Sequence, residues 1–214
     1  MNVSISGLYA ITPDLTDTEQ LLSLVESALR GGAGVIQYRN KIATPTQRLA
    51  QAHALQALCQ SYRKPLIIND HLDLAVAVNA AGLHLGGDDG SLSEARRQLK
   101  PHQCLGASCY DRLELAQTAV AAGADHIAFG SFFPSSVKPF APRPPLSLIR
   151  SARQLLPVPI VAIGGITLDN APSLIDAGVS AIALISNLFA APDVYARARQ
   201  FHNLFVPPTS SHQN

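Results

Sequence analysis

The segment AAGADHIAF, residues 121–129, joins the end of a helix-like run to a strand-like apolar run through a single glycine. The same junction recurs in RGGAGVIQ at 30–37, NAAGLHL at 79–85 and DAGVSAIAL at 176–184. Glycine readily adopts the left-handed conformation that ends many helices, and short helix-to-strand connections are typical of repeated strand–helix units. These junctions predict an α/β chain built on parallel strands.

Further units become visible when every strand-like run is counted. Such runs begin near Leu8, Val35, Leu66, Leu83, Cys104, Ile127, Ile160 and Ala181. The segments between them have helical period, and two have capping signals at their starts, Thr16 with Glu19 and Thr44 to Gln47. Eight units in 214 residues predict a single-domain (β/α)8 TIM barrel at residues 1–206. We expect the polar, proline-rich residues 207–214 to be a flexible tail.

Composition excludes several classes of protein. Hydrophobic residues make up 47% of the chain and charged residues 14%, which indicates a folded globular protein. A formal net charge of +1 without a basic block argues against nucleic-acid binding. No apolar run suits a membrane span and no signal peptide is evident, so we expect a cytoplasmic protein. Apolar outer helices would allow a homo-oligomer but do not require one. The three cysteines, Cys59, Cys104 and Cys109, lack a CxxC spacing and predict reduced, buried thiols.

Polar residues and glycines follow the strand-like runs at the points where the runs end. Because the carboxyl ends of parallel strands open on one face of an α/β fold, these residues are expected around one mouth. They are Gln37, Arg39, Lys41, Asn69, Asp70, Asp88, Asp89, Ser108, Gly164, Gly165 and Ser186.

Acidic residues at two neighbouring strand ends suggest a cation site. Carboxylates of Asp70 and of Asp88 or Asp89 could share Mg²⁺, which favours one or two carboxylates together with substrate phosphate oxygens. The alternative is that these acids cap the helices that follow them.

Cations converge on the same mouth. Gln37 and Arg39 alternate with Tyr38, so both point to the barrel interior, where an arginine needs an anion or a partner acid. With Lys41 and Lys138, Arg39 could neutralise a diphosphate leaving group; the alternative is an internal ion pair of Arg39 with Asp70 or Asp89. His84 is read as a satisfied core residue.

The run IVAIGG, residues 160–165, leads into a helix, and glycines there let backbone N–H groups approach a phosphate. With the next strand end, they predict a monophosphate site from Gly164, Gly165, Ile185 and Ser186. The long loop at 131–145 has five prolines and two cations, which predicts a lid or binding loop; the alternative is a proline-stiffened surface loop.

Over residues 7–205 the chain resembles the thiamine phosphate synthase family. The resemblance is carried by an ordered set of segments: LYAIT, GVIQYRNK, LIINDHLDLA, GLHLGGDD, LGASCY, HIAFGSFFPSSVK, PIVAIGGITLDNAPSLIDAG and ALIS.

The resemblance implies a transferase that joins a hydroxymethylpyrimidine diphosphate to a thiazole monophosphate, uses Mg²⁺ and releases pyrophosphate. It implies that Arg39 and Lys138 are catalytic and that Asp70 and Asp89 hold the metal. The pyrimidine diphosphate would be bound by Gln37, Arg39, Lys41, Asn69, Ser108 and Lys138. The thiazole phosphate would be bound by Ser135, Ser136, Gly164, Gly165, Ile185 and Ser186. The implied mechanism is dissociative: pyrophosphate leaves first, and the thiazole nitrogen then captures a methylene cation.

Two other functions compete with the synthase. A thiazole-phosphate tautomerase would need the monophosphate site but neither the metal nor the diphosphate site, so Asn69, Asp70 and the QYRNK segment argue against it. A non-catalytic thiamine-phosphate binder is favoured only by departures in the loop, such as Val137 where the family often has threonine.

Overall fold

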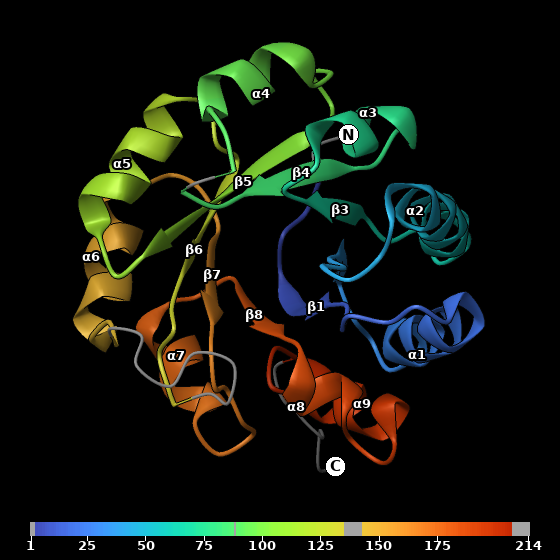
Figure 1. Cartoon of the computed structure of the whole chain (residues 1–214). Helices are drawn as coiled ribbons and strands as arrows, with labels where there is room; N and C mark the ends of the chain where they lie inside the picture. The colour runs from blue at the N-terminus through green and yellow to red at the C-terminus, as the bar shows by residue number, and fades with distance from the viewer. Residues whose placement is uncertain (1–2, 88, 135–142, 207–214) are drawn as a thin grey trace, which may run out of the picture.

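The computed structural model describes residues 3–87, 89–134 and 143–206 and contains eight parallel strands closed into one barrel (Figure 1). Each strand pairs with its neighbours in the sequence, and β8 pairs with β1 to close the sheet. The prediction of a (β/α)8 barrel is therefore confirmed. The strands are β1 Gly7–Ile11, β2 Val35–Tyr38, β3 Leu66–Asn69, β4 Gly82–Leu85, β5 Cys104–Tyr110, β6 His126–Phe129, β7 Ile160–Ile163 and β8 Ala181–Leu184.

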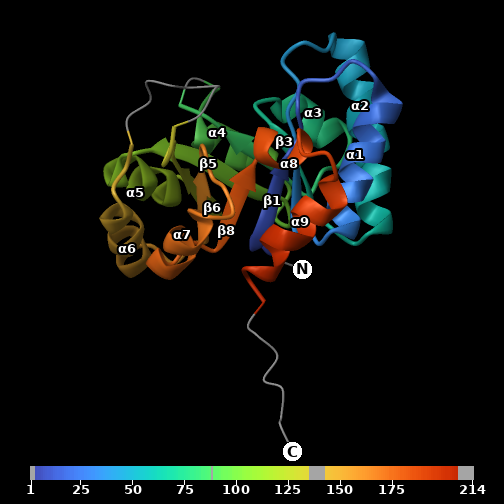
Figure 2. The ribbon, with the colours of Figure 1, turned by 90° about the horizontal axis from the view of Figure 1, so that it is seen from below.

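Helices surround the barrel, and α9 returns beside α1 after the last strand (Figures 1 and 2). A one-turn helix, α8, intervenes between β8 and α9. The helices are α1 Thr18–Arg30, α2 Pro45–Ser61, α3 Leu72–Ala77, α4 Leu92–Gln98, α5 Leu113–Ala121, α6 Leu146–Leu155, α7 Ala171–Ala177, α8 Ser186–Phe189 and α9 Val194–Asn203.

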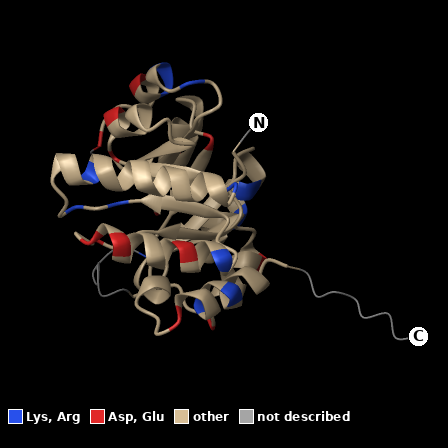
Figure 3. Cartoon of the chain, turned by 90° about the vertical axis from the view of Figure 1, so that its right-hand side faces the viewer, with Lys and Arg blue, Asp and Glu red and all other residues tan. Residues whose placement is uncertain are grey.

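The surface carries both signs of charge. Acidic and basic residues are interspersed along the ribbon in the view of Figure 3, with no long run of one sign there. None of the helices in the described part of the chain has the length and apolar character needed to cross a bilayer.

The predicted helix starts are right in one case and wrong by one residue in the other. Thr44 caps α2, since its hydroxyl accepts a hydrogen bond from the Gln47 N–H, and Pro45 is the first helical residue. At α1 the cap is Asp17 instead of Thr16, because the Asp17 carboxylate accepts from the Gln20 N–H. Aspartate and threonine are adjacent here, and both are good caps.

Three of the four glycine junctions use a left-handed glycine, namely Gly32, Gly123 and Gly178. The fourth differs, because Asn79 takes the positive φ of 48° and Gly82 becomes the first residue of β4. Asparagine tolerates this conformation better than most residues. Gly82 is needed for a different reason, since a Cβ there would lie 2.4 Å from the Cys104 carbonyl oxygen and sulfur.

Alternation along the strands separates two apolar cores. One faces the helices and includes Leu8, Ile36 and Ile68, whereas the other fills the barrel and includes Tyr9 and Val35. The cysteines Cys59, Cys104 and Cys109 are free and buried, as predicted. The division of the chain at residue 206 stays a prediction, because residues 207–214 lie outside the described part.

A buried polar contact fixes the loop after β2. Gln51 of α2 is fully buried, and its side-chain oxygen accepts hydrogen bonds from the Tyr38 hydroxyl at 2.7 Å and the Asn40 amide at 2.9 Å. Its amide donates to the Leu15 carbonyl at 3.0 Å. Gln51 therefore joins the segments after β1 and β2 to α2.

We expect Gln51→Leu to lower the free energy of unfolding by about 2–4 kcal/mol, because it leaves buried donors without an acceptor. Urea denaturation measures the loss. Gln60→Leu, at an exposed position of the same helix, is the control and should change stability by less than about 0.5 kcal/mol. Equal stability of the two variants would contradict the structural role of Gln51.

Candidate active site

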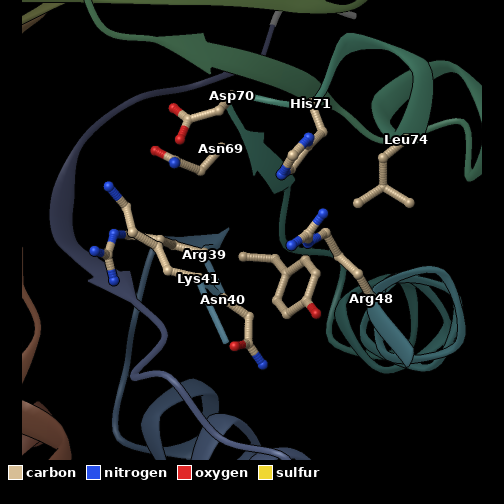
Figure 4. A pocket seen from close by; sticks show the side chains of 9 residues that line it. Arg39, Asn40, Lys41, Arg48, Asn69, Asp70, His71 and Leu74 are labelled. Atoms are coloured by element: carbon tan, nitrogen blue, oxygen red, sulfur yellow. The ribbon is translucent and has the colours of Figure 1, made fainter. Parts of the chain in front are cut away.

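A pocket of about 230 Å³ opens at the carboxyl ends of β2 and β3 (Figure 4). Four residues predicted for the site line it together, Arg39 and Lys41 from the β2 side and Asn69 and Asp70 from the β3 side. The complete lining is Tyr38, Arg39, Asn40, Lys41, Arg48, Asn69, Asp70, His71 and Leu74.

Arg39 is held by an acid that the sequence analysis did not single out. Its guanidinium nitrogen Nη1 lies 3.1 and 3.2 Å from the two carboxylate oxygens of Asp14. Asp14 also accepts the backbone N–H of Lys41 at 2.7 Å. The expected alternative, an ion pair of Arg39 with Asp70 or Asp89, is wrong, because the segment after β1 provides the partner.

The Asp70 and Asp89 side chains are brought together. Burial, followed by a hydrogen bond and charge repulsion from Asp89, raises the pKa of Asp70 to about 6, although Lys41 and Arg39 oppose this rise. Asp70 also adopts a left-handed backbone with φ of 65°. Strained backbone and a shifted pKa at one residue are typical of functional sites.

Neither of these acids caps a helix. The cap of α3 is His71 and the cap of α4 is Ser91, whereas the Asp89 carboxylate accepts from the Gly86 N–H at 2.9 Å. The capping alternative is therefore wrong for Asp70 and Asp89. Asp88 lies outside the described residues.

The segment that carries Asp89 is also held from β5. The Tyr110 hydroxyl accepts a hydrogen bond from the Gly87 N–H at 3.0 Å, and a Cβ on Gly87 would approach that hydroxyl to 3.2 Å. The absence of a side chain at residue 87 thus allows Tyr110 to reach the backbone beside Asp89. The sequence offered no pattern that pairs these two residues.

Gln37 and Ser108 extend the site into the barrel interior. The Gln37 amide donates to the Tyr9 hydroxyl at 2.9 Å, and the Ser108 hydroxyl lies 3.0 Å from Nε2 of His84. His84 is buried as expected, but its Nδ1 has no hydrogen-bond partner among the described residues. Only one of the two ring nitrogens of His84 therefore has a hydrogen-bond partner there.

The loops after β7 and β8 are tied to each other. Ser186 is the first residue of α8, and Asn187 beside it donates to the Ile166 carbonyl at 2.7 Å. Gly164 and Gly165 have φ of 101° and 63°, and a Cβ on Gly165 would lie 2.3 Å from the Pro134 carbonyl oxygen. The glycines therefore let the loop after β6 pack directly on the loop after β7.

Three predicted loop residues, Ser135, Ser136 and Lys138, lie outside the described residues, so the lid stays a prediction. Cys109 lies within the described part, and burial raises the pKa of its thiol to about 12. A thiol that stays protonated at neutral pH is a poor nucleophile, in keeping with the prediction of an inert, buried cysteine.

Asp14 could have been found from the sequence, because it follows the first apolar run as the other site residues follow theirs. Arg48 and Tyr110 could not, since Arg48 comes from the first turns of α2 and Tyr110 from an extension of β5 past the rim.

Comparison with known proteins places this geometry in a family. Residues 8–188 match the family model described as thiamine monophosphate synthase. The thiamine-phosphate synthase of Methylobacillus flagellatus is 56% identical over 201 residues, which cover 94% of this chain and 96% of the relative. That of Azoarcus sp. is 51% identical over 206 residues, covering 96% of this chain and all of the relative.

Solved structures agree with the sequence comparison. Thiamine phosphate pyrophosphorylase from Pyrococcus furiosus superposes with a TM-score of 0.81 and 33% identity, covering 93% of this chain and 95% of the other. A 3-hexulose-6-phosphate synthase, at 17% identity and a TM-score of 0.71, shares the fold alone. The chain belongs to the thiamine monophosphate synthase family.

Proposed function

We propose that this protein is a transferase that condenses 4-amino-2-methyl-5-hydroxymethylpyrimidine diphosphate with a thiazole monophosphate, giving thiamine phosphate and pyrophosphate. The observation that carries the proposal is the placement of Arg39 and Lys41 beside the Asp70 carboxylate in one pocket at the barrel rim. Cations and acids together suit a diphosphate that arrives with a divalent metal ion.

The diphosphate end of the pyrimidine substrate is assigned to this pocket. Arg39 is oriented by Asp14, and Lys41 is exposed at the rim without an ion pair in the described part of the chain. The Asn69 side chain lies between these cations and Asp70 in the pocket (Figure 4). Its amide could therefore donate a hydrogen bond to a phosphate oxygen. Gln37, deeper in the barrel, would contact the pyrimidine side of the substrate. Ser108 would contact the pyrimidine or the diphosphate, and Lys138 would close over the diphosphate.

Asp70 and Asp89 fit a magnesium site. Two carboxylates close enough to raise one pKa repel each other when both are ionised, and a divalent cation relieves that repulsion. Within the described residues no group of three or more His, Cys, Asp or Glu side chains could hold a metal ion. The remaining ligands would then be phosphate oxygens and water, which is the coordination that Mg²⁺ favours. When bound, Mg²⁺ neutralises charge that develops on the leaving pyrophosphate.

The thiazole monophosphate is assigned to the loops after β7 and β8. Gly164 and Gly165 present backbone without side chains, and Ile185 and Ser186 open the one-turn helix α8. A phosphate between these two loops is the common arrangement in (β/α)8 barrels. Ser135 and Ser136 would complete the site from the lid.

The chemistry asks the protein for charge and position more than for proton transfer. The C–O bond to the diphosphate breaks, and its electron pair leaves with pyrophosphate, which Arg39 and Lys138 hold. The aminopyrimidine ring stabilises the methylene cation, and the thiazole nitrogen supplies the electron pair for the new C–N bond. A positioned strong base is not required, in keeping with the neutral, buried histidines of the barrel.

An isomerase that acts on a thiazole phosphate alone would leave Arg39, Lys41 and the acid pair without a role. Curated relatives at 45–56% identity are named thiamine-phosphate synthase, which favours the transferase. Cytoplasmic location, lack of a nucleic-acid partner and a possible homo-oligomer stay predictions from sequence.

We expect the purified protein to release pyrophosphate only when both substrates and Mg²⁺ are present, and to stop when EDTA is added. A coupled pyrophosphate assay measures this. Equal rates in EDTA would contradict the metal site, and release without the thiazole phosphate would indicate hydrolysis instead of transfer.

We expect Asp89→Ala and Lys138→Ala each to lower turnover at least about 100-fold, the scale of losing one transition-state contact. Lys64→Ala, an exposed cation just before β3 at the opposite end of the barrel, is the control and should keep the wild-type rate. Near-normal turnover of both site variants would remove this mechanism.

We expect Asp70→Asn to stabilise the metal-free protein above about pH 6. The raised pKa of Asp70 means that its contribution to stability is fully present at low pH and is lost as pH rises through about 6. Asparagine removes that loss and tolerates the left-handed backbone at this position.

The measurement is the unfolding free energy in EDTA between pH 4 and pH 8, with Asp73→Asn in the exposed first turn of α3 as control. The gain of Asp70→Asn over wild type should grow with pH. A gain that is constant with pH would contradict the assignment.

A further inference from the structure

Two histidines meet inside the barrel below the rim. His84 of β4 and His126 of β6 have ring centroids 5.6 Å apart, on either side of Gly106 in β5. A Cβ on Gly106 would lie 2.5 Å from Nδ1 of His84 and 2.3 Å from Nε2 of His126. These two ring nitrogens therefore face the same small space, which the glycine leaves open.

The hydrogen bonds of the two rings are incomplete. Nδ1 of His84 and both nitrogens of His126 are buried without a partner among the described residues, whereas Nε2 of His84 lies 3.0 Å from the Ser108 hydroxyl. Burial lowers the pKa of His84 to about 4 and that of His126 to about 3, so both rings are neutral near pH 7. A neutral imidazole has one donor nitrogen and one acceptor nitrogen.

The tautomer of His84 decides whether the Ser108 hydroxyl can donate a hydrogen bond toward the mouth of the barrel or can only accept one. A hydroxyl has one proton. If Nε2 accepts, that proton points inward, and Ser108 presents only lone pairs to the mouth. If Nε2 carries the hydrogen and donates it, the serine proton is free to point outward. An anionic substrate can use only the second arrangement, because phosphate oxygens accept hydrogen bonds.

We propose that His84 is a positioning residue, which in its Nε2–H tautomer donates to Ser108 and thereby directs the serine proton to a phosphate oxygen of the pyrimidine diphosphate. This inference rests on the proposed function, since it takes the diphosphate as the anion that Ser108 contacts.

His126, which lies across Gly106 from His84, favours the Nε2–H tautomer of His84. In the Nε2–H form of His126, its N–H faces the bare Nδ1 of His84 across the space at Gly106. On its other side His126 approaches the Tyr9 ring, with centroids 6.2 Å apart, and the Tyr9 hydroxyl accepts from Gln37. Ser108, His84, His126, Tyr9 and Gln37 thus form a row of neighbouring side chains in the barrel interior.

A double-mutant cycle separates this role from simple packing. We expect His84→Leu to raise KM for the pyrimidine diphosphate about tenfold, the scale of one hydrogen bond to a charged group, and to leave KM for the thiazole phosphate within twofold. Ser108→Ala should have a similar effect, and adding His84→Leu to Ser108→Ala should cause no further loss.

The conservative variant His84→Gln provides the rescue, because a glutamine amide can donate from the position of Nε2. We expect it to recover most of the affinity that His84→Leu loses. Independent, multiplying effects of His84→Leu and Ser108→Ala would overturn the proposal. So would an equal rise in both KM values, or a His84→Gln variant as impaired as His84→Leu.

A second measurement does not depend on turnover or on folding of a variant. ¹⁵N-histidine NMR of the wild-type protein reports the tautomer of each buried ring, and we expect Nε2–H at His84. A stable Nδ1–H form would overturn the proposal even if the enzyme is active. If folded wild-type protein releases no pyrophosphate, the proposed function fails, and the NMR result still decides how His84 meets Ser108.

Discussion

Closure of the parallel sheet is the constraint on which the site depends. Because β8 pairs with β1 in the same direction as every other pair, the barrel has no free edge, and all carboxyl ends of the strands open on one rim. Residues that are far apart in sequence therefore lie around one mouth, because each follows a strand that ends at this rim. Below the rim the strands are apolar on both sides except for a few buried polar residues such as Gln37, His84 and His126, and the positions at the strand ends are free to carry charge.

The rim gathers charges that are costly to hold together. Asp70 combines a left-handed backbone with a pKa raised by burial and by Asp89, and Arg39 needs Asp14 to hold its position. Such features lower stability and persist where function requires them. Under the proposed function the substrates would compensate them, because a diphosphate and a divalent ion would supply the opposite charges that the pocket lacks.

The architecture could be predicted because its signals are local. Apolar runs and glycine junctions such as AAGADHIAF repeat along the chain, and one strand end after another carries a polar residue. What could not be predicted depends on tertiary neighbours. Whether Thr16 or Asp17 caps α1, whether Gly82 or Asn79 turns left-handed, and which acid holds Arg39 are decided by distances of a few ångströms between segments. Tyr110 reaches Gly87 only because β5 extends beyond its neighbours.

We propose that a divalent ion at Asp70 and Asp89 is coordinated jointly by the protein and the diphosphate, and not by the protein alone. Mn²⁺ binding followed by electron paramagnetic resonance tests it, with Mn²⁺ as the probe in place of Mg²⁺ and with or without inorganic pyrophosphate. The account predicts that the protein binds Mn²⁺ at least about tenfold more tightly when pyrophosphate is present, and that Asp70→Asn removes this gain. Mn²⁺ affinity that is the same with and without pyrophosphate, after correction for the Mn²⁺–pyrophosphate complex in solution, would contradict it.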